Sequence, residues 1–404
     1  MAEMQLRPAL ALALVACGGS HAAAPDAAPP PPDAPSGPFT EATPSSTPVM
    51  MKVSGDVLAN PVVQPIFFAV DDPSIVTLTN TFLAQLATST YWPAVATEYG
   101  VGALTVDQAI ITGDAAPTTD TGLSSWIANH FNGENGWPAA PDPQTIYAVF
   151  LPPGVTVTTQ FGQSCETFGG YHDEATGPSN ESIVFAIMPR CPGGIDLLTT
   201  VTSHELIEAS TDPRIETAPA YAVLDAPHYV WGYTPGDEVG DMCEYLASAD
   251  QPLVGDFYVQ RIWSNASAAA GHDPCVPVPT TPYLGAMPVF TETLPIPSIF
   301  DGSTVMTQGV QVAMGTPATI EVDVFSDQPT GEFNVHADDV ASVIMGGQPE
   351  LSFTWDRQAA HNGDKLHVTI TRLQEGQGGG SELVLVTDDP EMNAVALWWG
   401  YVAN

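Results

Sequence analysis

Two near-continuous apolar runs, Gln144–Leu151 and Ser182–Met188, are the strongest features of the hydrophobic pattern. Runs without polar alternation are typical of strands in the middle of a sheet, with both faces buried. Val62–Val70 predicts a first strand of the same unit, and Phe257–Asn265 predicts a late one. We therefore expect residues 49–280 to form one domain that contains a buried sheet.

Between these strands, apolar residues recur at helical spacing. The spacing predicts a helix over Ser74–Trp92, which Pro93 should break or kink, and a short helix over Thr121–Phe131. Leu104–Ile111 is expected to be a strand or a loop. Strands mixed with helices place this domain in the α+β class.

A third helix is expected between Asp196 and Asp212. Asp196 is a suitable N-cap, and Asp212-Pro213 is a stop signal. The apolar positions at roughly helical spacing are Leu197, Leu198, Val201 and Ile207. This pattern predicts a half-buried helix whose last polar residues lie on or beside the apolar stripe.

Residues 281–404 follow a different pattern, in which most apolar runs alternate with polar residues at period two. With Gly, Pro, Asp and Asn between the runs, this predicts an antiparallel β-sandwich that resembles accessory immunoglobulin-like domains of secreted bacterial enzymes. The expected strands are Val310–Met314, Ala318–Phe325, Lys365–Thr371 and Glu382–Thr387. Trp398, Trp399 and Tyr401 either close a strand core or form an aromatic surface that binds cell-wall polysaccharide.

The third predicted helix carries His204-Glu205-Leu206-Ile207-Glu208 near its end. Residues four apart lie on one helix face, so His204 and Glu208 can bind the same ion. Glu205 then stands where a general base would deprotonate water, as in the His-Glu-x-x-His metalloproteases. Zinc accepts imidazole and carboxylate ligands, and the carboxylate makes Mn or Ca more competitive. The alternative is a solvated acidic helix face with an incidental histidine.

A metal site needs a further ligand, and three residues are candidates. Glu238 is the first choice and Asp241 the second, in the Gly-punctuated segment Gly236–Asp241. Each of these two could instead be an exposed turn acid. His172 is a third candidate ligand, or a catalytic group on the substrate side that donates a proton or stabilises an oxyanion. Asp212, beside Pro213, suits a role at the helix end.

The N-terminus predicts export. A short basic region and the apolar run Ala9–Ala16 describe a signal peptide over residues 1–17. Leu14-Val15-Ala16-Cys17 resembles the bacterial lipobox, in which the cysteine is lipidated; an ordinary signal peptide cleaved elsewhere is the alternative. Residues 18–48, rich in Ala and Pro, predict a disordered tether. We therefore expect an outer-membrane or cell-surface lipoprotein, attached to the membrane through its N-terminal lipid alone.

Four cysteines remain after Cys17: Cys165, Cys191, Cys243 and Cys275. An even number in an exported protein indicates disulfides, and three connectivities are open. The pairs Cys165–Cys191 and Cys243–Cys275 are favoured because they close shorter loops. No Cys-x-x-Cys pair supports a cysteine-rich zinc site.

The charge of the chain limits its partners. The formal net charge is −38, from 46 acidic residues against 8 Lys plus Arg. Such a field repels nucleic acid and anionic lipid surfaces, and it favours cationic substrates or divalent ions. We therefore expect no nucleic-acid partner.

Six segments in order resemble the Exordium/phosphate-induced protein family and its bacterial relatives, which are described as zinc-dependent proteases. They are Thr88–Trp92, Gly169–His172, Ser203–Ala209, Thr211–Pro213, Glu238–Cys243 and Val259–Asn265. The resemblance covers roughly residues 60–277, and its collinear order is more specific than any one motif. It implies a secreted protein and makes His172, His204, Glu205, Glu208, Glu238 and Asp241 the residues to test.

Taken together, these patterns predict a zincin-like mixed domain followed by an immunoglobulin-like β-sandwich. The expected function is an exported zinc-dependent metallohydrolase, a peptidase acting on a protein or peptide. The alternative is a non-catalytic surface-binding or adhesin protein with a structural metal ion.

Overall fold

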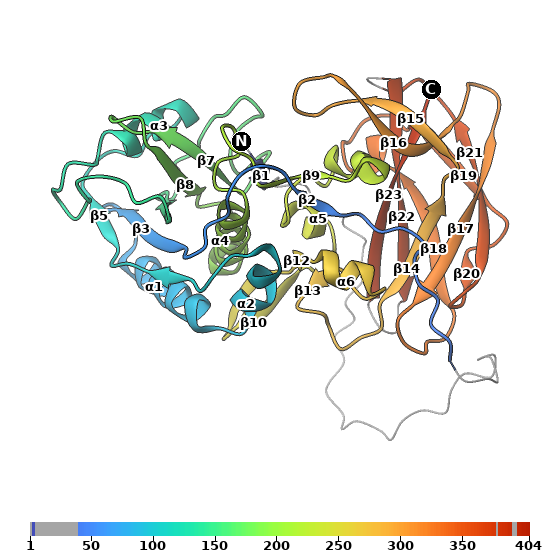
Figure 1. Cartoon of the computed structure of the whole chain (residues 1–404), viewed down its shortest axis with the longest axis horizontal. Helices are drawn as coiled ribbons and strands as arrows, with labels where there is room; N and C mark the ends of the chain where they lie inside the picture. Colours follow the sequence, from blue (N-terminus) through green and yellow to red (C-terminus); the bar gives the residue numbers. More distant parts are fainter. Residues whose placement is uncertain (1, 5–38, 377–378, 390–393) are drawn as a thin grey trace.

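The structure is a computed structural model that describes residues 2–4, 39–376, 379–389 and 394–404. An α/β body and a β-sandwich lie next to each other, and the N-terminal residues 39–52 run across both (Figure 1). The class is mixed, with parallel and antiparallel strand pairs.

The central sheet of the α/β body has the strand order β1-β7-β8-β6-β3-β4, with β5 also paired to β3. The strands β3, β6 and β8 run parallel, whereas β7 is antiparallel to β8. The bounds are β1 Ala2–Met4, β3 Val62–Phe68, β4 Thr105–Val106, β5 Ile110–Thr112, β6 Thr145–Phe150, β7 Gly170–Thr176 and β8 Ser182–Met188. The two strongest apolar runs of the sequence are thus adjacent buried strands, as predicted.

Both faces of this sheet are covered. Along β6, Ile146, Ala148 and Phe150 belong to the core shared with the helix α4, Gly194–Thr211. Tyr147 and Val149 belong to a separate core with the helix α3, Asp120–Ala128. Because successive strand residues point to opposite faces, an apolar run without alternation is what a two-sided burial requires.

Helix α4 is more deeply buried than the sequence predicted. Every residue from Leu198 to Thr211 is buried, so the expectation of a half-buried helix was wrong. The N-cap is Gly193 rather than Asp196, which lies in the first turn. The helix ends at Thr211 with Asp212 as its C-cap, as the Asp212-Pro213 signal predicted. A helix enclosed on all sides must find partners for its polar side chains inside the protein.

The first predicted helix is two helices, α1 Pro73–Thr88 and α2 Tyr91–Ala96. The break falls at Ser89, whose backbone is extended, and not at Pro93. Pro93 lies in the first turn of α2, where its missing N–H costs no helical hydrogen bond. A 3-10 turn, η1 Thr97–Tyr99, follows α2.

The segment between α4 and the sandwich consists of short elements that pack on α4. They are β9 Tyr221–Leu224, which pairs with β2 Met50–Lys52, η2 Ala226–Gly232, α5 Asp241–Glu244, β10 Asp250–Val254, β11 Phe257–Gln260, β12 Ile262–Trp263, α6 Asn265–Ala269 and β13 Cys275–Val276. The predicted late strand over Phe257–Asn265 is therefore β11 and β12, followed by the start of α6.

The C-terminal body is a two-sheet sandwich. One sheet has the order β14-β17-β21-β19 and the other β15-β16-β23-β22-β18-β20. The bounds are β14 Leu284–Val289, β15 Glu292–Pro297, β16 Thr304–Gln311, β17 Ala318–Ser326, β18 Phe333–Asp339, α7 Val340–Val343, β19 Leu351–Trp355, β20 Ala359–Ala360, β21 Lys365–Arg372, β22 Gly380–Asp389 and β23 Ala394–Ala403. The sandwich is not wholly antiparallel as expected, because β16 and β23 pair in parallel.

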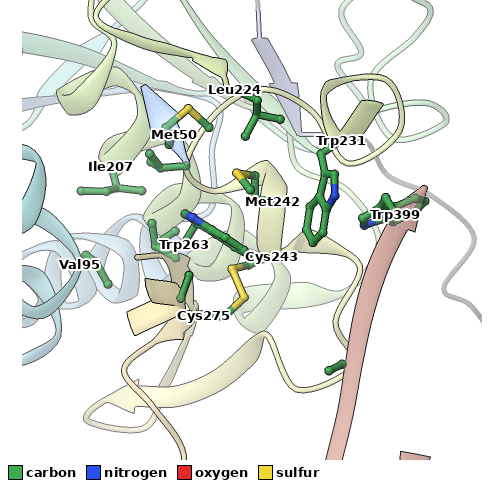
Figure 2. Close-up of a cluster of buried hydrophobic side chains, with 14 of the residues drawn as sticks. Met50, Val95, Ile207, Leu224, Trp231, Met242, Cys243, Trp263, Cys275 and Trp399 are labelled. Carbon is green, nitrogen blue, oxygen red and sulfur yellow. A yellow bond between two sulfur atoms is a disulfide. The ribbon is translucent and has the colours of Figure 1, made fainter. Parts of the chain in front are cut away.

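The junction of the two bodies is aromatic. Trp231 of η2 packs on Trp263 of β12 and on Trp398 of β23, with ring centroids 5.6 Å apart in each pair. Figure 2 shows Trp231 beside Trp399 at one end of a cluster that continues to Ile207 of α4. Trp398, Trp399 and Tyr401 are 6%, 2% and 4% exposed, so they close a core rather than forming an aromatic surface.

The predicted signal peptide and tether fall mostly outside the described residues. Among residues 1–17, only 2–4 are described, as β1, and Cys17 lies outside. Residues 39–48 are described and lie against the folded body: Asn362 of the sandwich hydrogen-bonds to the backbone of Thr40 and Ala42. The predicted tether is therefore shorter than residues 18–48. In the described part of the chain, no helix combines the length and apolarity that crossing a membrane requires.

Both favoured disulfides are present, Cys165–Cys191 and Cys243–Cys275. Their partners are 26 and 32 residues apart in sequence. The second bond lies inside the buried cluster and connects α5 to β13 (Figure 2).

The double variant Cys243→Ser/Cys275→Ser is expected to lose about 2–4 kcal/mol of unfolding free energy, because the bond restricts the unfolded chain. It should also weaken binding at the metal site that the sequence predicts, since α5 carries Asp241. Denaturant unfolding and metal titration measure the two effects. The matched control, Cys165→Ser/Cys191→Ser, should lose similar stability and keep its metal affinity. Equal metal affinity in both double variants would contradict the coupling.

Candidate metal centre

Three elements bring the candidate residues together on one face of the central sheet. Helix α4 supplies His204, Glu205 and Glu208 from its last turns. Strand β7 supplies His172. Tyr171 and Ala175 of the same strand belong to the core on the other face of the sheet, which contains α3. The start of α5 and the loop before it supply the downstream carboxylates.

His204, Glu208 and Asp241 form one group. Nε2 of His204 lies 2.9 Å from Oε2 of Glu208 and 3.6 Å from Oδ1 of Asp241. One ligand atom from each of the three lies within 4.8 Å of the others. The pairing of His204 with Glu208 one helical turn on, inferred from sequence spacing, is therefore present.

His172, Glu208 and Glu238 form a second group that shares Glu208. Nε2 of His172 lies 3.3 Å from Oε1 of Glu238, and its Nδ1 lies 3.9 Å from Oε2 of Glu208. The same Nδ1 is 3.6 Å from Oε2 of Glu205. All six residues singled out in the sequence thus gather in one place.

The centre is enclosed and its charge is unbalanced. All six residues are 0% exposed except Asp241, at 5%. Three of the carboxylates, those of Glu208, Glu238 and Asp241, face two imidazoles, and their ion pairs in the described part of the chain involve histidine alone. Both carboxylate oxygens of Glu238 and Oδ1 of Asp241 accept no hydrogen bond there. Buried carboxylates need a cation or a proton, and this donor set fits a divalent cation.

Gln260 of β11 orients His204. The Nδ1–H of His204 donates to Oε1 of Gln260 at 3.0 Å, and Nε2 of Gln260 donates to the carbonyl of Gly240 at 2.7 Å. The backbone N–H of Gln260 donates to Oγ of Ser203. A hydrogen bond to one ring nitrogen fixes the tautomer and leaves the other lone pair for a metal. Nε2 of His204, which faces Glu208, is the ring nitrogen available to a metal ion.

The two oxygens of Glu208 have different surroundings. Oε1 accepts the backbone N–H groups of Gly240 and Asp241, at 3.0 and 3.1 Å. These bonds hold the carboxylate so that Oε2 faces the two histidines. A metal ligand supported in this way loses little freedom when it binds an ion.

Two glycines allow the close packing of this centre. A Cβ on Gly240 would lie 2.7 Å from both Oε1 of Glu208 and Nδ1 of His204. A Cβ on Gly170 would lie 2.8 Å from Oε1 of Glu205 and 2.6 Å from Cγ1 of Val201. A side chain at Gly240 would displace Glu208 and His204, and one at Gly170 would displace Glu205 and Val201.

Burial and charge shift the pKa values of these groups in different directions. Burial lowers the pKa of His172 to about 4, and the nearby charge of Glu208 only partly opposes this. Burial also lowers the pKa of His204, but Glu208, Glu205 and Asp241 outweigh it and hold the pKa well above its usual value. Burial, followed by the charge of Glu208, raises the pKa values of Glu238 and Asp241 well above the usual range. Without a metal, the centre therefore retains protons that a divalent cation would replace.

Asp212 has the helix-end role expected from the sequence. Its backbone N–H donates to the carbonyl of Glu208, and its Oδ1 accepts the N–H of Ala220 at 2.7 Å. Its own carbonyl lies 3.3 Å from Nε2 of His172. Burial raises the pKa of its carboxyl to about 6.

Sequence reasoning found the titratable residues and missed those that position them. Gln260, Gly170 and Gly240 were not predicted to serve the site. Gln260 lies in the segment Val259–Asn265 that the sequence analysis singled out, but no role was predicted for it. Neutral side chains and glycines act through contacts that only the fold reveals.

Comparisons with known proteins add little. No protein-family model and no curated protein matches the chain. Among solved structures, the chain is similar to the crystal structure of the titin M3 domain, with 10% sequence identity over 29% of this chain and 94% of that domain. The TM-score of 0.15 is too low to support an argument about fold or function.

Gln260→Leu is expected to weaken zinc binding about 10–100-fold, because His204 loses the acceptor that fixes its tautomer. Competition with a chromophoric chelator measures the affinity. Gln251→Leu on the neighbouring strand β10, where the side chain donates a hydrogen bond to the carbonyl of Ser248, is the matched control and should bind zinc normally. Unchanged affinity in Gln260→Leu would show that the hydrogen bond does not orient a ligand.

The metal-free protein is expected to lose stability as pH rises from about 4 to about 7. Asp212 has a folded-state pKa of about 6 against an ordinary value of 3.8, so the folded protein binds more protons across this window. At about 1.4 kcal/mol per pKa unit, the loss from Asp212 reaches about 3 kcal/mol. Melting temperatures measured in the presence of a chelator should fall over this pH range, and Asp212→Asn should make the fall smaller.

Zinc should raise the melting temperature more at pH 7 than at pH 5. The opposite order would contradict the replacement of protons at Glu238 and Asp241 by zinc.

Proposed function

We propose that this chain is an exported, lipid-anchored zinc-dependent metallohydrolase, a peptidase whose metal centre lies in a zincin-like domain. The observation that carries the proposal is the buried pair of His204 Nε2 and Glu208 Oε2, with Gln260 on the other ring nitrogen of His204. Such an arrangement is typical of a metal ligand with its supporting hydrogen bond. Three buried carboxylates, Glu208, Glu238 and Asp241, pair only with histidines among the described residues, which adds a reason for a divalent ion.

The ligands would be His204, Glu208 and a third residue from the two groups around Glu208. We favour His172 for that position over the role of a proton donor. Its lowered pKa keeps the imidazole neutral, which is the form that binds metals. Glu238 and Asp241 would complete the coordination or balance the charge. Zinc fits this mixed donor set, and Mn or Ca would compete because carboxylates are hard ligands.

Glu205 is the proposed general base. A bound divalent ion would supply Lewis acidity, acidifying water and polarising a carbonyl group. Glu205 then takes the proton from the attacking water and delivers it to the leaving amine. The residues around Glu205 suit this task. His204 precedes it in the chain, and Gly170 of β7 has no side chain, which leaves space for the Glu205 carboxylate. His204 and Glu208 hold their positions while the proton moves.

Access to the centre follows from the same proposal. Strand β1 lies along the outer edge of β7, with Ala2 opposite His172. Lipobox processing before Cys17 would remove β1 and free that edge for an extended peptide. The lipid on Cys17 would then be the only attachment to the membrane.

One observation favours the alternative function, a surface-binding or adhesin protein with a structural ion. The near-complete burial of all six residues is typical of closed structural sites rather than open catalytic ones. In that case the β-sandwich, with its immunoglobulin-like character, would bear the binding activity toward a partner such as cell-wall polysaccharide. Because Trp398, Trp399 and Tyr401 are buried, exposed residues would have to make that contact.

Purified protein is expected to contain zinc, and Glu205→Gln should lower peptide hydrolysis by about 10²–10⁴-fold, because the general base is lost. Zinc content, measured by elemental analysis, should not change. Glu134→Gln, at an exposed residue distant in sequence, is the control and should remain active. If Glu205→Gln changes nothing while His204→Ala only lowers the melting temperature, the ion is structural and the alternative function holds.

A further inference from the structure

A second polar cluster lies at the junction of the two bodies. Oγ of Ser46 is 3.3 Å from Nε2 of His228, and Nδ1 of His228 is 2.8 Å from Oδ2 of Asp225. The order of hydroxyl, imidazole and carboxylate is that of a nucleophile, its base and the group that orients the base. None of the three residues belongs to the metal centre.

Local structure holds each member of this cluster. Oδ1 of Asp225 accepts the backbone N–H of Val49 at 2.7 Å, which directs Oδ2 toward His228. Residues Met50–Lys52 pair with β9, so the chain after Ser46 is fixed to the body. His228 follows Asp225 in η2 and its N–H donates to the carbonyl of Asp225. The imidazole is 5% exposed and packs against Trp398.

The cluster opens into a cavity of about 340 Å³ between the two bodies. Its walls combine polar groups with apolar side chains, among them Trp231, Met287, Phe290, Trp398 and Trp399. His228 is the one titratable group among its lining residues in the described chain. The lining residues include no Asp, Glu, Lys or Arg, so the cavity offers a charged ligand no counter-ion, and the net charge of −38 further disfavours anions.

Trp231 adds an unused donor to this cavity. Its Nε1 is buried and has no hydrogen-bond partner in the described part of the chain. A buried indole N–H ordinarily finds an acceptor, so a donor left open beside a cavity indicates an acceptor on the ligand. A carbonyl oxygen, or the oxyanion formed from it, would satisfy it.

We propose that Ser46, His228 and Asp225 form a second, metal-independent hydrolase site for uncharged esters with an apolar acyl group. Oγ of Ser46 attacks the ester carbonyl while Nε2 of His228 takes its proton. The carbon–oxygen bond to the alcohol breaks, and His228 returns the proton to the leaving alcohol. Water then hydrolyses the acyl-serine ester with His228 as the base, which releases the acid and restores the hydroxyl. Asp225 holds the imidazole and stabilises its positive charge.

The test is covalent labelling of the full chain with a fluorophosphonate probe in the presence of EDTA. Mass spectrometry should locate the adduct on Ser46, and the same protein should hydrolyse p-nitrophenyl butyrate. Ser46→Ala should abolish both signals. Asp225→Asn, which keeps an oxygen for Val49, should slow labelling at least about 100-fold because the imidazole is held in the wrong tautomer.

Thr47→Ala is the matched control, because it removes a hydroxyl from the adjacent residue, which does not line the cavity. It should label and hydrolyse as the unaltered chain does. Absence of a Ser46 adduct on the folded chain would overturn the proposal, as would labelling of Ser46 that Asp225→Asn leaves unchanged. Either result would leave Ser46 with the structural role of tying the N-terminal segment to His228. Because EDTA is present throughout, neither result depends on the metallohydrolase.

Discussion

The burial of several carboxylates inside the α/β body is the constraint that shapes the rest of the structure. Glu205, Glu208, Glu238 and Asp241 are buried together with His172 and His204. Removing carboxylates from water is costly unless a cation or a proton accompanies them. The pKa directions show how this cost is met without a metal: Glu238 and Asp241 are driven toward their neutral forms, and His204 is held in its charged form. A divalent cation would meet the same cost for several groups at once.

The surrounding fold is arranged to keep these groups in place. Because α4 is buried from Leu198 to Thr211, its polar side chains in this range cannot reach water. Backbone N–H groups from the start of α5 hold Glu208, while the side chain of Gln260 from β11 holds His204. Each element is short, so its position depends on the helix that it packs on. The site and the core of this body are therefore one cooperative unit.

The sequence predicted the features that repeat or that carry charge. Apolar runs identified β6 and β8, and the spacing of His204 and Glu208 identified their shared helix face, because both follow from backbone periodicity. The six titratable residues were found because few residue types bind metals. What could not be predicted depends on distant contacts. Strand β7 is polar for a strand, Ser89 rather than Pro93 ends α1, and the parallel pairing of β16 with β23 joins strands far apart in sequence. The roles of Gln260 and Gly240 follow from their contacts with His204, which the sequence does not reveal.

Under the proposed function, the bond between Cys243 and Cys275 would set an order of events for the maturing chain. It links α5, which contains Asp241, to the strand β13, and the two cysteines are 32 residues apart in the sequence. In a newly made chain with free thiols this link would be missing, and Asp241 would not be held beside the other metal ligands. Oxidation would therefore precede stable metal capture. A chain of this design would stay latent in a reducing environment and become loaded only where disulfides form.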